Sequence, residues 1–189
     1  MALDSESRWR LVRKLKAAPK PIEGDTEIRP ARLEDLQAIC EIYNYYILNS
    51  VVTFDIEVYD RQFWVDKLEY LKSQEFPFIV AVSPAGQVLG YAYLAPYTQK
   101  AGYRRTAEIS IYLKPSAMGI RLGTRLMTEV LTLGKKAGIR QVIAVISDQK
   151  ADGSIAIHKK FGFKEQGRLG KVGFKFGKWL GTILFQKSL

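Results

Sequence analysis

Apolar residues recur along the chain with two spacings, and each change of spacing marks the boundary of an element. Intervals of three and four residues are typical of amphipathic helices, and short β-branched or aromatic runs are typical of strands. The predicted helices span 36–47, 60–73, 122–136 and 152–161. The predicted strands span 27–32, 78–82, 87–94, 106–113, 141–146, 165–172 and 179–186. The pattern therefore predicts the order β-α-α-β-β-β-α-β-α-β-β.

One pair of strands is expected to be parallel. The run 141–146 (QVIAVI) is apolar on both faces, as a central strand should be. The helix at 122–136 connects 106–113 to this run, so the unit reads as a crossover between parallel neighbours. The fold class is therefore α/β (α+β), a mixed central sheet with helices on both faces, in one domain over 26–189.

Composition restricts the kind of protein. The 189 residues fit one domain, and with 47% hydrophobic and 25% charged residues disorder is not expected. The single cysteine, Cys40, excludes an internal disulfide and is predicted to be a buried, inert thiol. One histidine and one cysteine also argue against a metal site. No secretory signal or membrane-length apolar run is visible, so the protein is expected to be cytoplasmic.

The net charge of +10 is unevenly distributed. Residues 26–98 hold 5 basic and 10 acidic side chains, a net charge of −5, whereas residues 99–189 hold 18 basic and 5 acidic, a net charge of +13. A basic second half suggests a bound polyanion or simply solvated lysines. Residues 1–25 form a basic N-terminal extension, which could contact a membrane surface or nucleic acid, or pack on its own domain or a partner subunit.

The segment 106–126 (TAEISIYLKPSAMGIRLGTRL) predicts a strand, a short loop and the start of a helix. A loop that opens a helix presents unpaired N–H groups and the positive end of the helix dipole, which together bind anions. The polybasic half of the chain surrounds this loop. The segment therefore suits a cofactor that carries phosphate groups.

Five motifs in order resemble the GNAT superfamily of acetyl-CoA-dependent N-acetyltransferases, and within it the phosphinothricin acetyltransferase-like subgroup. The motifs are IRPARLEDLQAICEIYNYYI, TFDIE, YRRTAEISIYLKP, SIAIHKKFGF and GFKFGKW. The resemblance covers about residues 27–188. It implies the GNAT fold, acetyl-CoA as co-substrate, a small-molecule amine as acceptor, and a homodimer.

The resemblance also implies an acetyl-CoA loop, which departs here from the family pattern. Met118 stands where the family has Gln or Arg, Arg121 replaces the first glycine, and Ala151 replaces an asparagine that precedes Ser154. An arginine at the glycine position could obstruct pyrophosphate or supply charge to it. The implied cofactor-binding residues are Ile111, Tyr112, Leu113, Gly119, Ile120, Arg121, Leu122, Gly123 and Thr124.

Two residues are candidates for catalysis. By family position Glu108 is the base that removes a proton from the attacking amine; the alternative is a surface carboxylate on an alternating strand. His158, the only histidine, lies three residues from Ile155 and from Phe161 and so on the inner face of its helix. It matches a histidine of the subgroup, and the alternative is a packed, hydrogen-bonded side chain.

Substrate recognition is implied for residues in the motifs that border the acceptor side. These are Phe54, Lys100, Tyr103, Arg104 and Lys175, with Trp179 as a further wall. Solvated surface charge is the alternative for each cation. Phe176 stands where the subgroup has a histidine, and Gly181 stands where it often has an acidic residue. These differences suggest an acceptor other than the subgroup's usual substrates.

The sequence therefore predicts an acetyl-CoA-dependent N-acetyltransferase for a small amino-acid-like amine of the phosphinothricin or methionine-sulfoximine type. Two alternatives stay open. A catalytically degenerate relative could serve as a regulatory or interaction module, as the altered loop would allow. An acetyltransferase for a protein amine or aminoacyl-tRNA would use the basic half of the chain, so a nucleic-acid partner also stays open.

Overall fold

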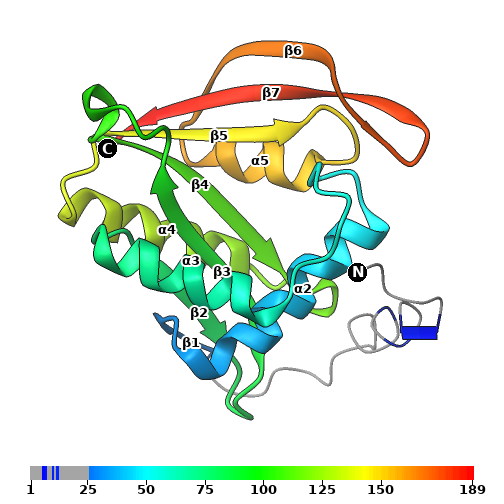
Figure 1. The fold of residues 1–189 in the computed structure, drawn as a ribbon. Coiled ribbons are helices and arrows are strands. Elements are labelled where there is room, and N and C mark those ends of the chain that lie inside the picture. Colours follow the sequence, from blue (N-terminus) through cyan, green and yellow to red (C-terminus); the bar gives the residue numbers. More distant parts are fainter. Residues whose placement is uncertain (1–5, 8–9, 11, 13–25) are drawn as a thin grey trace.

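The computed structural model describes residues 6–7, 10, 12 and 26–189, and over the last of these ranges the predicted order of elements is confirmed (Figure 1). The strands are β1 (Glu27–Pro30), β2 (Phe78–Val82), β3 (Val88–Pro96), β4 (Thr106–Leu113), β5 (Gln141–Ser147), β6 (Lys164–Lys175) and β7 (Lys178–Ser188). The α-helices in this range are α2 (Leu36–Asn49), α3 (Arg61–Ser73), α4 (Leu122–Lys136) and α5 (Asp152–Lys160). Short 3-10 turns lie at η1 (Leu33–Asp35), η2 (Ala101–Tyr103) and η3 (Pro115–Ala117).

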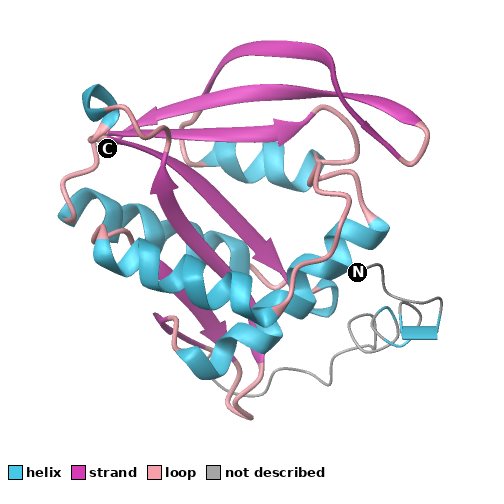
Figure 2. Cartoon of the chain, in the orientation of Figure 1, coloured by secondary structure: helices cyan, strands magenta, loops and turns pink. Residues whose placement is uncertain are grey.

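The strands form one mixed sheet of seven in the order β1-β2-β3-β4-β5-β7-β6. Figure 2 draws the strands in magenta and the helices in cyan. Every neighbouring pair is antiparallel except β4 and β5, which are parallel as their connection through α4 predicts. The expected fold class is therefore confirmed.

The parallel pair separates soon after it forms. Only three register pairs join β4 to β5, and the last joins Glu108 to Ile143. Beyond this pair the two strands diverge, and Figure 1 shows the opening between them. The facing edges of 109–113 and 144–147 have no strand partner, so their backbone polar groups are open to whatever lies between them.

Two apolar cores hold helices on opposite faces of the sheet. One core packs α4 and α5 against the sheet around residues such as Ile109, Leu126 and Phe185. The other packs α2 and α3 around an aromatic group that includes Trp64 and Tyr91. Alternate residues of β4 face opposite cores, so Glu108 and Tyr112 share the face of α2 and α3.

The last two strands are longer than the sequence pattern predicts. They run together from Lys164 to Ser188 through a two-residue turn at Phe176 (φ 51°) and Gly177 (φ 72°). Positive φ at both turn residues is the geometry that suits the twist of a hairpin. Phenylalanine is an unusual first residue for such a turn, which is why the pattern did not reveal how far the strands extend.

The predicted basic extension at 1–25 falls almost entirely outside the described residues, so that prediction stays as it stands. Among the residues that the structure describes, no helix has both the length and the apolar character needed to cross a membrane.

Candidate active site

A cleft of about 880 Å³ occupies the opening between β4 and β5. The separated parts of these strands, 109–113 and 144–146, line it, together with the end of α2, the loop before α4, and α5. The hydroxyl group of Tyr46 from α2 donates to the carbonyl oxygen of Leu113 at 2.6 Å, which satisfies one backbone group at the end of β4. The cleft is thus lined by α2, by the loop before α4 and by α5 around the exposed strand edges.

The start of α4 presents a run of unpaired amides to this cleft. Among the described residues, the N–H groups of 119–124 have no hydrogen-bond partner, and no side chain caps the helix. Two of these residues, Gly119 (φ 80°) and Arg121 (φ 62°), have left-handed backbone conformations. Consecutive amides at a helix N-terminus form a site suited to phosphate. The sequence-based expectation of an anion site therefore has matching geometry.

Arg121 takes the left-handed conformation that a glycine would adopt without strain. It occupies the position at which the resemblance implies a glycine. Its side chain is exposed and the residue lines the cleft, so the guanidinium group is within reach of the unpaired amides. A guanidinium group there adds positive charge and hydrogen-bond donors suited to phosphate oxygens.

Glu108 lies where β4 and β5 separate, and it lines the cleft. Burial raises the pKa of its carboxyl group, and the charge of Lys67 partly offsets this rise. Its carboxylate makes no hydrogen bond or ion pair with any described residue, although it is only partly exposed. A carboxylate with a raised pKa and open acceptor sites is a suitable proton acceptor.

His158 is buried, as its predicted inner-face position requires, and it also lines the cleft. Its Nδ1 lies 2.7 Å from the carbonyl oxygen of Ser154, so Nδ1 carries the hydrogen and Nε2 is an acceptor. That Nε2 atom has no partner among the described residues. Burial lowers the pKa of the ring, and the bond to Ser154 partly opposes this effect, so the ring is neutral at pH 7.

The residues expected to bind cofactor lie at the cleft, with one exception. Ile120 is exposed and does not line it. The lining members are Ile111, Tyr112, Leu113, Gly119, Arg121, Leu122, Gly123 and Thr124. The fold therefore brings these eight residues together with Glu108 and His158.

The residues expected to bind substrate do not line the cleft. Lys100, Tyr103 and Arg104 are exposed in the loop that carries η2, before β4. Phe54 packs against Gly173, where an added Cβ would meet its ring at 2.5 Å. Lys175 is buried, and its ammonium group donates to the Thr53 carbonyl oxygen at 2.8 Å. The trio on the loop is free to contact an acceptor from outside, whereas Lys175 already has an internal partner.

Several lining residues were not identified from the sequence. Tyr45, Tyr46 and Asn49 come from the last turns of α2, Lys150 precedes α5, and Lys160 is the last residue of α5. The sequence signal for the three residues of α2 was a polar end on an otherwise apolar helix. The two lysines were indistinguishable in sequence from other surface lysines.

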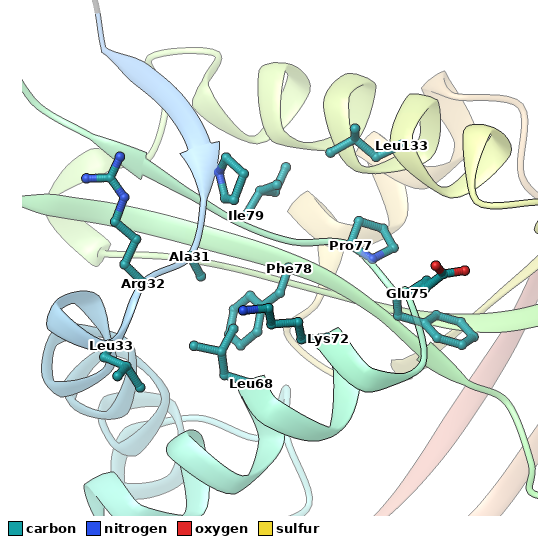
Figure 3. Close-up of a pocket in the computed structure, with 12 residues that line it drawn as sticks. Ala31, Arg32, Leu33, Leu68, Lys72, Glu75, Pro77, Phe78, Ile79 and Leu133 are labelled. Atoms are coloured by element: carbon teal, nitrogen blue, oxygen red, sulfur yellow. The ribbon is translucent and has the colours of Figure 1, made fainter.

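A second cavity of about 580 Å³ lies away from this cleft and shares no lining residue with it (Figure 3). It is formed between the turn after β1, the end of α3 and the start of β2, with Leu133 of α4 at one side. Figure 3 shows mainly apolar side chains around it, with Arg32, Lys72 and Glu75 as the charged ones. It contains neither Glu108 nor His158, whereas the cleft contains both.

Comparison with known proteins agrees with this geometry. The family model for the acetyltransferase (GNAT) domain matches residues 28–184. Phosphinothricin N-acetyltransferase of Streptomyces viridochromogenes is 35% identical over 168 residues, covering 89% of this chain and 90% of that protein. The L-methionine sulfoximine/L-methionine sulfone acetyltransferase of Pseudomonas paraeruginosa is 33% identical, covering 86% and 94%.

Solved structures give the same result. A phosphinothricin acetyltransferase from Sinorhizobium meliloti in complex with acetyl-CoA has a TM-score of 0.83 and 35% identity, covering 87% of this chain and 88% of that one. An N-acetyltransferase from Staphylococcus aureus also has a TM-score of 0.83, with 31% identity and coverage of 87% and 99%. The resemblance, the fold and the enzyme class expected from the sequence are thereby confirmed, and the chain belongs to the GNAT family of acetyltransferases.

Proposed function

We propose that this protein transfers the acetyl group of acetyl-CoA to the amine of a small amino-acid-like molecule in the cleft between β4 and β5. The observation that carries the proposal is the run of unpaired amides at 119–124, which fits the pyrophosphate of the co-substrate. The relatives' names, which refer to phosphinothricin and to methionine sulfoximine and sulfone, support this class of acceptor. Partly buried Glu108 lies near the point where the cleft begins.

The reaction places simple demands on these residues. Acetyl-CoA supplies a thioester, whose carbonyl carbon is attacked by the neutral amine while the thiolate leaves. Glu108 accepts the proton that the amine loses, either directly or through one water molecule. Open N–H groups on the separated edge of β4 are suited to polarise the thioester carbonyl. His158 offers Nε2 as a neutral hydrogen-bond acceptor.

The test measures binding and transfer separately. Calorimetric titration with acetyl-CoA should show saturable binding, and bound acetyl-CoA should raise the melting temperature by mass action. Thiol release should then depend on added L-methionine sulfoximine, L-methionine sulfone or phosphinothricin. Absence of acetyl-CoA binding would contradict the proposal. If acetyl-CoA binds but the acetyl group is transferred only to protein or aminoacyl-tRNA amines, the proposed acceptor class would be wrong, whereas the proposed acetyl-CoA site would stand.

We also propose a homodimer, supported by the exposed hairpin of β6 and β7. β6 is an edge strand of the sheet, and most of its residues are exposed. Its hairpin carries exposed apolar side chains at Leu169, Val172, Phe174, Phe176 and Trp179. Such a patch on an unprotected edge favours association with a second copy. Light scattering should give a dimer mass, and Phe174→Ser with Trp179→Ser should reduce it to that of a monomer.

A further inference from the structure

Lys67 has an unusual environment for a surface lysine. It lies on α3, with its Nζ 4.8 Å from the ring centre of Tyr93 and 5.9 Å from that of Phe63. A cation over aromatic faces at these distances is attracted electrostatically, so the rings hold the ammonium group in place. Among the described residues it has no hydrogen-bond or ion-pair partner. Its three N–H donors are therefore available to a bound molecule.

The register of the sheet places this lysine near Glu108. Tyr93 on β3 pairs with Ser110 on β4, and Ala95 pairs with Glu108. Tyr93 and Glu108 are therefore diagonal neighbours on the same face, with Cα atoms about 7–8 Å apart. The ring that supports the ammonium group of Lys67 is thus next to the carboxylate at the start of the cleft.

The two charges are close but do not form an ion pair. The positive charge of Lys67 lowers the pKa of Glu108, so the groups lie within electrostatic range. Their nitrogen and oxygen atoms are nevertheless more than 4.0 Å apart, the limit for an ion pair. A negative and a positive group therefore lie near each other on this side of the sheet without forming an ion pair, Glu108 lining the cleft and Lys67 on α3 outside its lining. An amino acid carries the complementary arrangement, an amine and a carboxylate on one carbon.

We propose that Lys67 binds the carboxylate of the acceptor while Glu108 receives the amine, so that Lys67 selects α-amino acids among small amines. This inference rests on the proposed function. The cations expected from the sequence are less suited to this role. Lys175 donates to a backbone carbonyl group, and Lys100 and Arg104 lie exposed in the loop before β4.

The experiment compares two acceptors that differ only in the carboxylate. These are L-methionine sulfone and its decarboxylated counterpart, 3-(methylsulfonyl)propylamine. In Lys67→Met, kcat/KM for the amino acid should fall about 10- to 100-fold, the size of a hydrogen bond to a charged group. For the amine without the carboxylate, kcat/KM should change less than about 2-fold, and Lys67→Arg should retain most of the preference.

Lys72→Met is the matched control because Lys72 lies on the same helix but lines the second cavity. It should leave both acceptors unaffected. An equal fall for both acceptors in Lys67→Met would overturn the inference, because Lys67 would then act through Glu108 alone. Unchanged values for both would also overturn it. Failure of the natural sequence to acetylate L-methionine sulfone, L-methionine sulfoximine or phosphinothricin would overturn the proposed function itself, and the inference with it.

Discussion

The ammonium group of Lys175 donates a hydrogen bond of 2.8 Å to the carbonyl oxygen of Thr53, which joins the tip of the β6–β7 hairpin to the segment after α2. The same ammonium group lies 5.1 Å from the ring centre of Phe176. Close contact between Phe54 and Gly173 adds to this connection. Burial lowers the pKa of Lys175 to about 8, and the charge of Asp55 only partly opposes this effect.

Lys175 should make stability depend on pH above 8. The unfolded chain keeps its lysines protonated up to about pH 10.4, so between pH 8 and 9.5 it binds more protons than the folded chain. The free energy of unfolding should therefore rise with pH in this window. Urea unfolding at pH 7.5, 8.5 and 9.5 should show a smaller rise in Lys175→Met than in the natural sequence. The control is Lys178→Met, on an exposed residue of the same hairpin, which should keep the rise.

His158 should have a pH signature of its own. Because burial lowers the pKa of its ring, the unfolded chain binds a proton more readily than the folded one below about pH 6.5. The free energy of unfolding should fall as the pH decreases from 7 to 5. His158→Gln should reduce this fall, and it is a clean comparison because the chain has one histidine.

Turnover by His158→Gln tests the catalytic alternative. We expect turnover to fall while acetyl-CoA affinity is retained, because the unpaired Nε2 belongs to a ring that lines the cleft. Turnover at the natural rate in a folded His158→Gln protein would make His158 a packing residue.

The order of elements could be predicted because each helix and strand has its own hydrophobic period. The parallel pairing of β4 and β5 also follows from the helix between them. The early separation of β4 from β5 could not be predicted, because Ile109, Ile111 and Leu113 are as apolar as residues of a paired strand. They pack in the core that includes α4 whether or not β4 is paired with β5 there. The length of β6 could not be predicted either. Glycines and lysines are frequent in this strand, and because most of its residues are exposed, apolar and polar residues do not alternate along it.

At the candidate site, residues near each other in sequence were easier to identify than residues joined by the fold. The loop at 118–124 and Glu108 lie in the one segment 106–126, and Glu108 and every residue of the loop except Ile120 line the cleft. Lys67 and Lys175 look alike in sequence, yet one lies over aromatic rings beside Glu108 and the other is buried against Thr53. Only the register of β3 with β4 and the position of the hairpin distinguish them.

Arg121 combines a strained backbone with a favourable charge, and two substitutions separate these effects. Arg121→Gly should stabilise the protein by about 1 kcal/mol, because a left-handed backbone costs a residue with Cβ roughly that much. Arg121→Ala keeps the strain and should not. Both should weaken acetyl-CoA binding by a similar factor in calorimetry, because both remove the guanidinium group from the site of the unpaired amides. Tighter binding by Arg121→Gly would instead mean that the arginine obstructs the cleft.

Glu108→Gln should lower turnover by about 10²-fold or more, because the amide keeps the shape of the side chain but cannot accept the proton. Acetyl-CoA affinity should change little, so the loss belongs to the chemical step.

Because burial raises the pKa of Glu108, kcat/KM of the natural protein should begin to fall, as the pH is lowered, at a pH above the ordinary carboxylate range. In Glu108→Gln this acid limb should disappear from the residual rate. Glu129→Gln is the matched control, since Glu129 lies on α4 and does not line the cleft. This variant should keep both the natural turnover rate and the acid limb of the pH profile. An unchanged profile in Glu108→Gln would assign the base to another group.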